Sequence, residues 1–204
     1  MEDLSDKRKI EYAVESADGG TVFVITDFTS MASYDCVKKV LQRLAEEGKL
    51  RRVMRGVYEK PQYNEFLGEY VAPSPDKVAH AIARNFGWAI VPCGDTALNM
   101  LGLSTQVPSV WMYVSDGPYK EYVFGGTVIR FKHSANRDIS KYSYKTALMI
   151  QAIKALGKGN VTDSVIKVLR SKLTEGEKKI MLSEANTATV WVYESIKKIC
   201  GGEQ

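Results

Sequence analysis

SYDCVKKVLQRLAEEGKLRRVMRGVYEKP (Ser33–Pro61) joins a helix-length amphipathic segment to a basic run and a Gly-Val-Tyr sequence. On a helical wheel, the apolar residues of segment 34–47 recur at the spacing i, i+3, i+4, i+7; they are Val37, Val40, Leu41 and Leu44. The opposite side of the wheel is basic and polar, with Lys38, Lys39, Gln42 and Arg43. We therefore predict a helix that packs through one side and presents cations on the other.

The flanking sequence places this helix within a recognisable order of elements. We predict a helix over 5–17, a strand over 21–25, a short helix over 27–32 capped by Thr26, the helix 34–47 capped by Ser33, and strands over 49–53 and 57–60. This order is the plan of a winged helix-turn-helix, which we assign to residues 1–61.

A helix of this kind can enter the DNA major groove, where Lys and Arg contact phosphate or guanine and Gln42 can bind adenine through two hydrogen bonds. The N-terminal end of a recognition helix usually lies deepest in the groove, and the arginines of the hairpin can reach the backbone. The predicted DNA-binding residues are Ser33, Tyr34, Lys38, Lys39, Gln42, Arg43, Arg51, Arg52 and Arg55.

The charge distribution points to the same segment. The chain of 204 residues has a net charge of +4, and residues 34–60 alone hold eight basic and four acidic residues. The remaining sequence is therefore neutral overall. Positive charge that is confined to one segment favours a phosphate-bearing partner over a generally solvated surface.

Beyond residue 61 we predict an aromatic connecting segment, 62–75, that packs against the neighbouring domains, and an α/β domain over 76–204. Segment 76–140 reads as mixed α/β, with an antiparallel β-meander of strands 110–114, 119–124 and 127–132 separated by Gly-containing turns. Segment 141–204 reads as mostly helical, over 144–156, 162–172, 175–185 and 188–199. The fold class is therefore α+β.

Several classes of protein are disfavoured. The N-terminus lacks the apolar region of a secretory signal, and no run approaches the ~18 apolar residues of a membrane span. Three dispersed cysteines and two histidines favour a reduced, cytoplasmic protein without a metal or other cofactor. The sequence has no GxxxxGK[ST], GxGxxG or GxSxG motif, so we expect no enzyme. Cys93 is expected to be a buried structural thiol.

A second, smaller cationic cluster follows the predicted meander and consists of Arg130, Lys132, His133 and Arg137. It is a weaker candidate for binding an acidic partner or nucleic acid. The alternative is an ordinary solvated edge of the sheet.

Three blocks of sequence resemble the AbiEi-type antitoxins of bacterial abortive-infection (phage-defence) systems, and in particular a short branch of that family. They are "RRVMRGVYEKP", "IVPCGDTALNMLGLSTQVPSVWMYVSDGP" and "IRFKHS", within residues 20–157. The resemblance implies a cytoplasmic DNA-binding transcriptional regulator that binds inverted repeats in double-stranded promoter DNA and represses its own toxin–antitoxin operon. It also implies antagonism of a nucleotidyltransferase-like toxin without a stable complex.

Two other functions stay open at the level of sequence. A winged helix can serve as a protein-interaction module without sequence-specific DNA binding, and aromatic residues elsewhere could anchor such an interface. A nucleic-acid-processing enzyme is less favoured, because "YKEYVF" and "TVIRFK" lack the carboxylate spacing of a metal-dependent nuclease.

Overall fold

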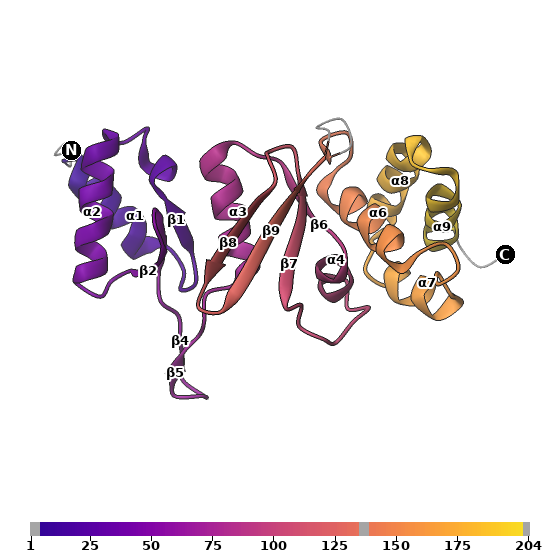
Figure 1. The fold of residues 1–204 in the computed structure, drawn as a ribbon, viewed down its shortest axis with the longest axis horizontal. Coiled ribbons are helices and arrows are strands. Elements are labelled where there is room, and N and C mark those ends of the chain that lie inside the picture. Colours follow the sequence, from indigo (N-terminus) through magenta and orange to yellow (C-terminus); the bar gives the residue numbers. More distant parts are fainter. Residues whose placement is uncertain (1–4, 135–138, 202–204) are drawn as a thin grey trace. The chain divides into compact units, whose positions relative to one another are not determined.

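The computed structural model describes residues 5–134 and 139–201 and has a mixed α+β fold (Figure 1). Contacts divide the described chain into two compact units. Unit 1 runs to Trp88 and includes Phe124–Gly126, and unit 2 comprises Ala89–Val123 and the chain from Thr127 onward. Residues 76–88, which we expected to belong to the second domain, are thus grouped with the first unit.

Unit 1 begins with helices and strands in the predicted order. They are α1 (Asp6–Ser16), β1 (Val22–Val24), the 3-10 helix η1 (Ile25–Phe28), α2 (Tyr34–Glu46), β2 (Arg51–Met54) and β3 (Val57–Glu59). The three strands form an antiparallel sheet in the order β1-β3-β2. Between β2 and β3, Gly56 has a φ of 78°, a conformation that costs glycine little and allows the tight turn.

Helix α2 forms where the amphipathic pattern predicts it. The Oγ of Ser33 accepts a hydrogen bond from the Cys36 amide and caps the first turn. The apolar residues Val37, Val40, Leu41 and Leu44 are all buried in one core with Ile10 and Val14 of α1 and Phe28 of η1. Tyr58 of β3 belongs to the same core.

The short helix before α2 differs from the prediction. It is a 3-10 helix over Ile25–Phe28, whereas we expected a helix over 27–32 capped by Thr26. The reason is that the carboxylate of Asp27 accepts a hydrogen bond from the Val24 amide at 2.9 Å, which starts the helical turn earlier. Asp27 thus supplies the cap that we assigned to Thr26.

The segment after β3 forms a β-hairpin of β4 (Tyr63–Asn64) and β5 (Glu69–Tyr70), which the sequence did not predict. It projects from its own unit in Figure 1. Its tip does not pack within unit 1, because Phe66 is 95% exposed and Leu67 is 60% exposed. The packing of this segment against the neighbouring domain stays a prediction.

Helix α3 (Pro75–Phe86) completes unit 1. Its residue Arg84 reaches across to Asp27: Nε donates to Oδ1 at 2.6 Å and one terminal nitrogen donates to Oδ2 at 3.0 Å. The same nitrogen donates to the Val22 carbonyl of β1. A bidentate pair of this kind is more specific than a single ion pair, and it ties α3 to both β1 and η1.

Unit 2 holds a sheet and a set of helices. In chain order these are β6 (Ile90–Pro92), α4 (Asp95–Met100), β7 (Val110–Ser115), β8 (Lys120–Phe124), β9 (Thr127–His133), α6 (Tyr144–Leu156), α7 (Asp163–Arg170), α8 (Glu175–Glu184), the 3-10 helix η2 (Ala185–Thr187) and α9 (Val190–Cys200). No described helix is long and apolar enough to cross a membrane.

The sheet of unit 2 is not the predicted antiparallel meander. Its strand order is β6-β7-β9-β8, and β7 pairs with β9 in parallel over residues 110–115 and 128–133. Burial explains the order: Ile129 and Phe131 of β9 are fully buried and suit an inner position, whereas β8 is largely exposed and suits an edge. The chain therefore runs from β7 to the edge strand β8 first, and β9 then lies between these two strands.

The helices of unit 2 follow the predicted boundaries closely and share one apolar core with β6 and α4. Polar contacts join the start of α6 to α8. The Glu184 carboxylate accepts from the amide and hydroxyl of Ser143, and Lys145 pairs with Glu177 at 2.7 Å.

Candidate nucleic-acid interface

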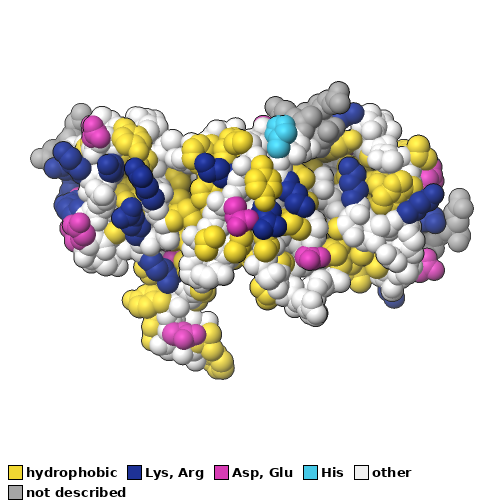
Figure 2. All heavy atoms as spheres, viewed as in Figure 1, with side chains coloured by type: hydrophobic (Ala, Val, Ile, Leu, Met, Phe, Trp, Pro, Cys, Tyr) yellow, Lys and Arg dark blue, Asp and Glu magenta, His cyan; other side chains and the backbone are white. Residues whose placement is uncertain are grey.

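The side of α2 opposite its apolar residues carries exposed cations that have no partner among the described residues. Lys38 and Lys39 are exposed and form no hydrogen bond or ion pair with another described residue. Tyr34 is exposed at the N-terminal end of the helix, and Gln42 is half-buried beside the lysines. Figure 2 shows Lys and Arg side chains gathered over this part of unit 1.

The β2–β3 hairpin of the same unit adds two more cations. Arg52 lies on β2 and Arg55 lies at the turn, and both are exposed without an ion pair to a described residue. Burial raises the pKa of Tyr58, and the positive charge of Arg52 partly opposes this shift. Helix α2 and the hairpin are therefore two sources of free positive charge within one compact unit.

The other four cations of segment 34–60 are engaged inside unit 1. Arg43 pairs with Glu11 of α1 and, more loosely, with Glu47. Lys49 pairs with Glu15 at 3.2 Å. Lys60 donates to the carbonyls of Glu15 and Ala17, where it caps the C-terminal end of α1. The charge excess that the sequence assigns to this segment is thus only partly available to a partner.

Arg51 is the clearest case of an engaged cation. Its Nε donates to Glu59 Oε2 at 2.9 Å, and a terminal nitrogen donates both to the same carboxylate and to the Val71 carbonyl at 2.6 Å. Glu59 is only 1% exposed, so the arginine neutralises a buried charge. Arg51 is therefore placed in an internal ion pair rather than on the exposed surface.

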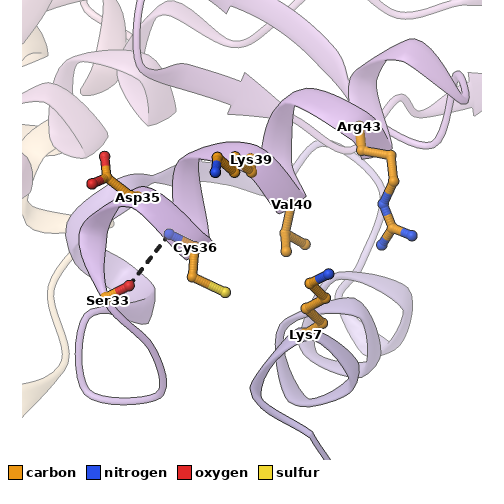
Figure 3. A pocket seen from close by; sticks show the side chains of 7 residues that line it. All are labelled: Lys7, Ser33, Asp35, Cys36, Lys39, Val40 and Arg43. Carbon is orange, nitrogen blue, oxygen red and sulfur yellow. Dashed lines mark hydrogen bonds between the residues drawn. The ribbon is translucent and has the colours of Figure 1, made fainter.

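A hollow of about 420 Å³ between α1 and α2 brings in a residue that the sequence analysis missed. It is lined by Lys7, Ser33, Asp35, Cys36, Lys39, Val40 and Arg43. Figure 3 shows the Lys7 side chain extending from α1 toward α2. Lys7 precedes the basic segment by some thirty residues, so only the packing of α1 on α2 reveals that it belongs to this cationic surface.

The second predicted cluster is dispersed by local contacts. Arg130 pairs with Glu121 of β8 at 2.8 Å, and His133 Nδ1 lies 2.8 Å from the Gly117 carbonyl. Lys132 is exposed, and Arg137 lies outside the described residues. Two of the four predicted residues thus have partners within the sheet region.

Two observations concern metal ligands and the Cys93 thiol. Among residues 5–134 and 139–201, no group of three or more His, Cys, Asp or Glu residues could hold a metal ion. Cys93 is buried, as predicted, and burial raises the pKa of its thiol, although nearby Lys132 partly opposes the shift. A protonated thiol is a poor nucleophile.

The structure is an α+β fold whose first unit carries exposed cations on α2 and on the β2–β3 hairpin. The chain belongs to a family described as "Family of unknown function (DUF6088)", whose model matches residues 9–181. No curated protein matches the chain. A similar solved structure is the "Crystal structure of RV2827C protein from Mycobacterium tuberculosis", with 12% identity over 95% of this chain and 75% of that chain and a TM-score of 0.44. A similarity this low supports no functional inference.

Proposed function

We propose that unit 1 is a winged helix-turn-helix that binds double-stranded DNA, with α2 in the major groove and the β2–β3 hairpin as the wing. The observation that carries this proposal is the convergence of Lys38, Lys39, Arg52 and Arg55 on one unit without internal ion pairs. The order of elements and the β1-β3-β2 sheet support it.

The proposed contacts differ from the set that sequence alone suggests. Lys38, Lys39, Arg52 and Arg55 remain as phosphate or base contacts, Tyr34 and Gln42 border them, and Lys7 joins them as a backbone contact. Ser33 contacts DNA through its hydroxyl proton, because its oxygen caps α2. Arg43 and Arg51 serve mainly to hold the unit together.

The direct test is fluorescence anisotropy with labelled duplex from the region upstream of the gene, against a shuffled duplex of equal length. We expect Lys38→Ala/Lys39→Ala to weaken binding to both duplexes by about tenfold or more, because each lost phosphate contact removes a released counterion. Gln42→Ala is expected to reduce the preference for the specific duplex more than the overall affinity.

A matched control removes equal charge elsewhere. Lys154→Ala/Lys179→Ala changes two exposed lysines on α6 and α8 of unit 2 and is expected to leave the affinity within about twofold of wild type. Equal weakening by both double variants, or equal binding of the two duplexes by the wild type, would remove the sequence-specific DNA-binding proposal.

The narrower proposal is that this regulator is an antitoxin that represses its own operon and counteracts a nucleotidyltransferase-like toxin. It is supported by the resemblance of the sequence blocks within residues 20–157 to AbiEi-type antitoxins. Co-expression with the product of the neighbouring gene tests it. We expect growth to be restored by the wild-type chain, and equal toxicity with and without the chain would contradict the antitoxin role.

A further inference from the structure

The β4–β5 hairpin of unit 1 presents an apolar tip for which unit 1 offers no cover. We call residues 62–71 the arm. Phe66 and Leu67 at its tip are largely exposed, and the exposed rings of Tyr63 and Tyr70 pack edge to face across the two strands at 5.2 Å. A two-stranded hairpin of this size has little stability of its own, and exposed apolar clusters usually mark an interaction site.

The arm is nevertheless well ordered by local contacts. Asn64 Oδ1 accepts hydrogen bonds from the amides of Phe66 and Leu67 at 3.0 and 3.1 Å, which sets the turn. At the base, the Val71 amide donates to the Gln62 carbonyl, and Arg51 donates to the Val71 carbonyl. A segment that is held in one conformation while its apolar side chains stay exposed is prepared for binding, because little ordering entropy is lost on association.

The arm is also acidic. Glu65 and Glu69 flank the apolar tip, both are exposed, and neither forms an ion pair with a described residue. Residues 62–71 contain no basic residue. The surface that receives the arm should therefore be apolar in the centre and basic at the rim.

Unit 2 offers a surface with these properties. A hollow of about 450 Å³ beside α9 is lined by Val190 and Trp191, with Thr189 and Ser195, and by the charged residues Lys158, Glu194 and Lys198. Val190 is 76% exposed, an unusual position for an apolar residue at the start of a helix that otherwise packs in the core. We call this hollow the α9 groove.

The charges of the α9 groove are opposite to those of the arm. Lys158 and Lys198 are exposed and make no ion pair with a described residue, whereas Glu194 is already neutralised by Lys197 at 2.7 Å. The free charge at the groove is therefore positive on both lysines, and the free charge of the arm is negative on both glutamates.

We propose that the arm of one copy of this chain docks in the α9 groove of a second copy, and that two copies exchange arms reciprocally in a homodimer. Phe66 and Leu67 cover Val190 and Trp191, while Glu65 and Glu69 approach Lys158 and Lys198. Each copy carries one arm and one groove, so a closed pair makes the contact twice, and the two contacts reinforce each other. The proposal is independent of DNA binding, because none of these residues belongs to the α2 surface.

The test measures mass by sedimentation equilibrium over a range of protein concentrations. We expect a dimer for the wild type. Phe66→Asp/Leu67→Asp on the arm and Lys158→Glu/Lys198→Glu at the groove should each raise the dimer dissociation constant by about tenfold or more, since each removes or reverses a complementary contact. All four side chains are exposed, so the variants are expected to fold, and circular dichroism spectra check this.

Charge reversal on both sides separates this contact from others. Glu65→Lys/Glu69→Lys should weaken the dimer alone, and combining it with Lys158→Glu/Lys198→Glu in one chain should restore the dissociation constant to within about threefold of wild type. A monomeric wild type, species larger than a dimer, or a dimer that either double variant leaves intact would overturn the proposal. Loss of the dimer with the arm variants but not with the groove variant would place the arm elsewhere and would also overturn it.

Discussion

At the scale of single residues, the environment of a cation decides whether it stabilises the protein or remains available to a partner. Arg51 and Arg52 are neighbours on β2 and alternate in direction, as successive strand residues do. Arg51 forms an ion pair with the buried Glu59, whereas Arg52 is exposed to solvent. Two adjacent arginines in one sequence run therefore have different roles.

These two arginines form a matched pair for the first prediction. Arg51→Ala is expected to lower the free energy of unfolding by about 2–3 kcal/mol, because it leaves the Glu59 carboxylate buried without a partner. Arg52→Ala should cost less than about 0.5 kcal/mol but should weaken DNA binding. Urea titrations followed by circular dichroism measure the first effect.

Adding Glu59→Gln to Arg51→Ala provides the control, since it removes the unpaired charge and should recover part of the lost stability. Equal urea midpoints for Arg51→Ala and Arg52→Ala would show that the Arg51–Glu59 ion pair contributes no more to stability than the exposed Arg52 does.

Glu11 restrains another cation of the proposed interface. Its pKa is lowered, chiefly by the hydrogen bond from Arg43, so the carboxylate is charged at neutral pH and holds the guanidinium against α1. Glu11→Gln should free Arg43 and strengthen binding to any duplex by about two- to fivefold at low salt. Anisotropy titrations with the shuffled duplex measure this.

Glu46→Gln is the matched control, because it removes the same charge from an exposed carboxylate on α2 that has no ion pair with a described residue. If Glu11→Gln and Glu46→Gln raise the affinity for the shuffled duplex equally, the change in net charge alone accounts for the effect, and the release of Arg43 does not contribute.

At the scale of helices and strands, the sequence predicted those elements best whose bounds depend on residues close together in the chain. Helix α6 has the predicted bounds 144–156, and the cap of α2 at Ser33 follows from residue type and spacing. The parallel pairing of β7 with β9 could not be predicted in this way, because it depends on which strand buries more surface. The arm was missed because its turn is set by the Asn64 side chain and its apolar residues suggested burial.

The prediction of the candidate site was limited in the same way, because local patterns can be read from the sequence and long-range contacts cannot. Segment 34–60 identified the cationic surface, but the partners that hold Arg43 and Lys49 against α1 lie far away in sequence. Glu11 is 32 residues from Arg43, and Glu15 is 34 residues from Lys49. Sequence spacing alone cannot assign such pairs.

The contact between α6 and α8 has a pH dependence that can be predicted. The pKa of Glu177 is lowered to about 2, first by the hydrogen bond from Lys145 and then by the amide and hydroxyl of Thr174. In the unfolded chain this carboxyl titrates near its ordinary pKa of 4.5. The folded state therefore binds the proton more weakly, and the stabilisation is fully present above about pH 4.5 and declines as pH falls toward 2.

Glu177→Gln should consequently be less stable than the wild type at pH 7, and the difference should shrink as pH is lowered from about 5 to 3. Urea midpoints at several pH values measure the difference, with Lys145→Met in the Glu177→Gln background expected to add little. A difference between wild type and variant that stays constant over this pH range would contradict the assignment of the cap and ion pair to Glu177.

At the scale of the whole molecule, net charge is a poor guide to which unit binds DNA. The helices of unit 2 also carry exposed lysines, including Lys154, Lys158, Lys167 and Lys179. The proposed function assigns binding to unit 1 because its free cations lie on one helix and on the hairpin of the same unit, whereas those of unit 2 surround a helical core. The two assignments differ in a quantity that can be measured on the intact protein.

That quantity is the salt dependence of DNA affinity. For duplex DNA, the logarithm of the binding constant falls against the logarithm of salt concentration with a slope of about −0.9 per neutralised phosphate. The five cations of the proposed interface, Lys7, Lys38, Lys39, Arg52 and Arg55, predict a slope of about −4.5 per bound chain, and Lys38→Ala/Lys39→Ala should reduce it to about −2.7. If all five are changed to Ala and a steep slope remains, cations of unit 2 hold the DNA. If a homodimer binds two half-sites, the slope should double to about −9 and should return to the single-chain value when Phe66→Asp/Leu67→Asp separates the copies.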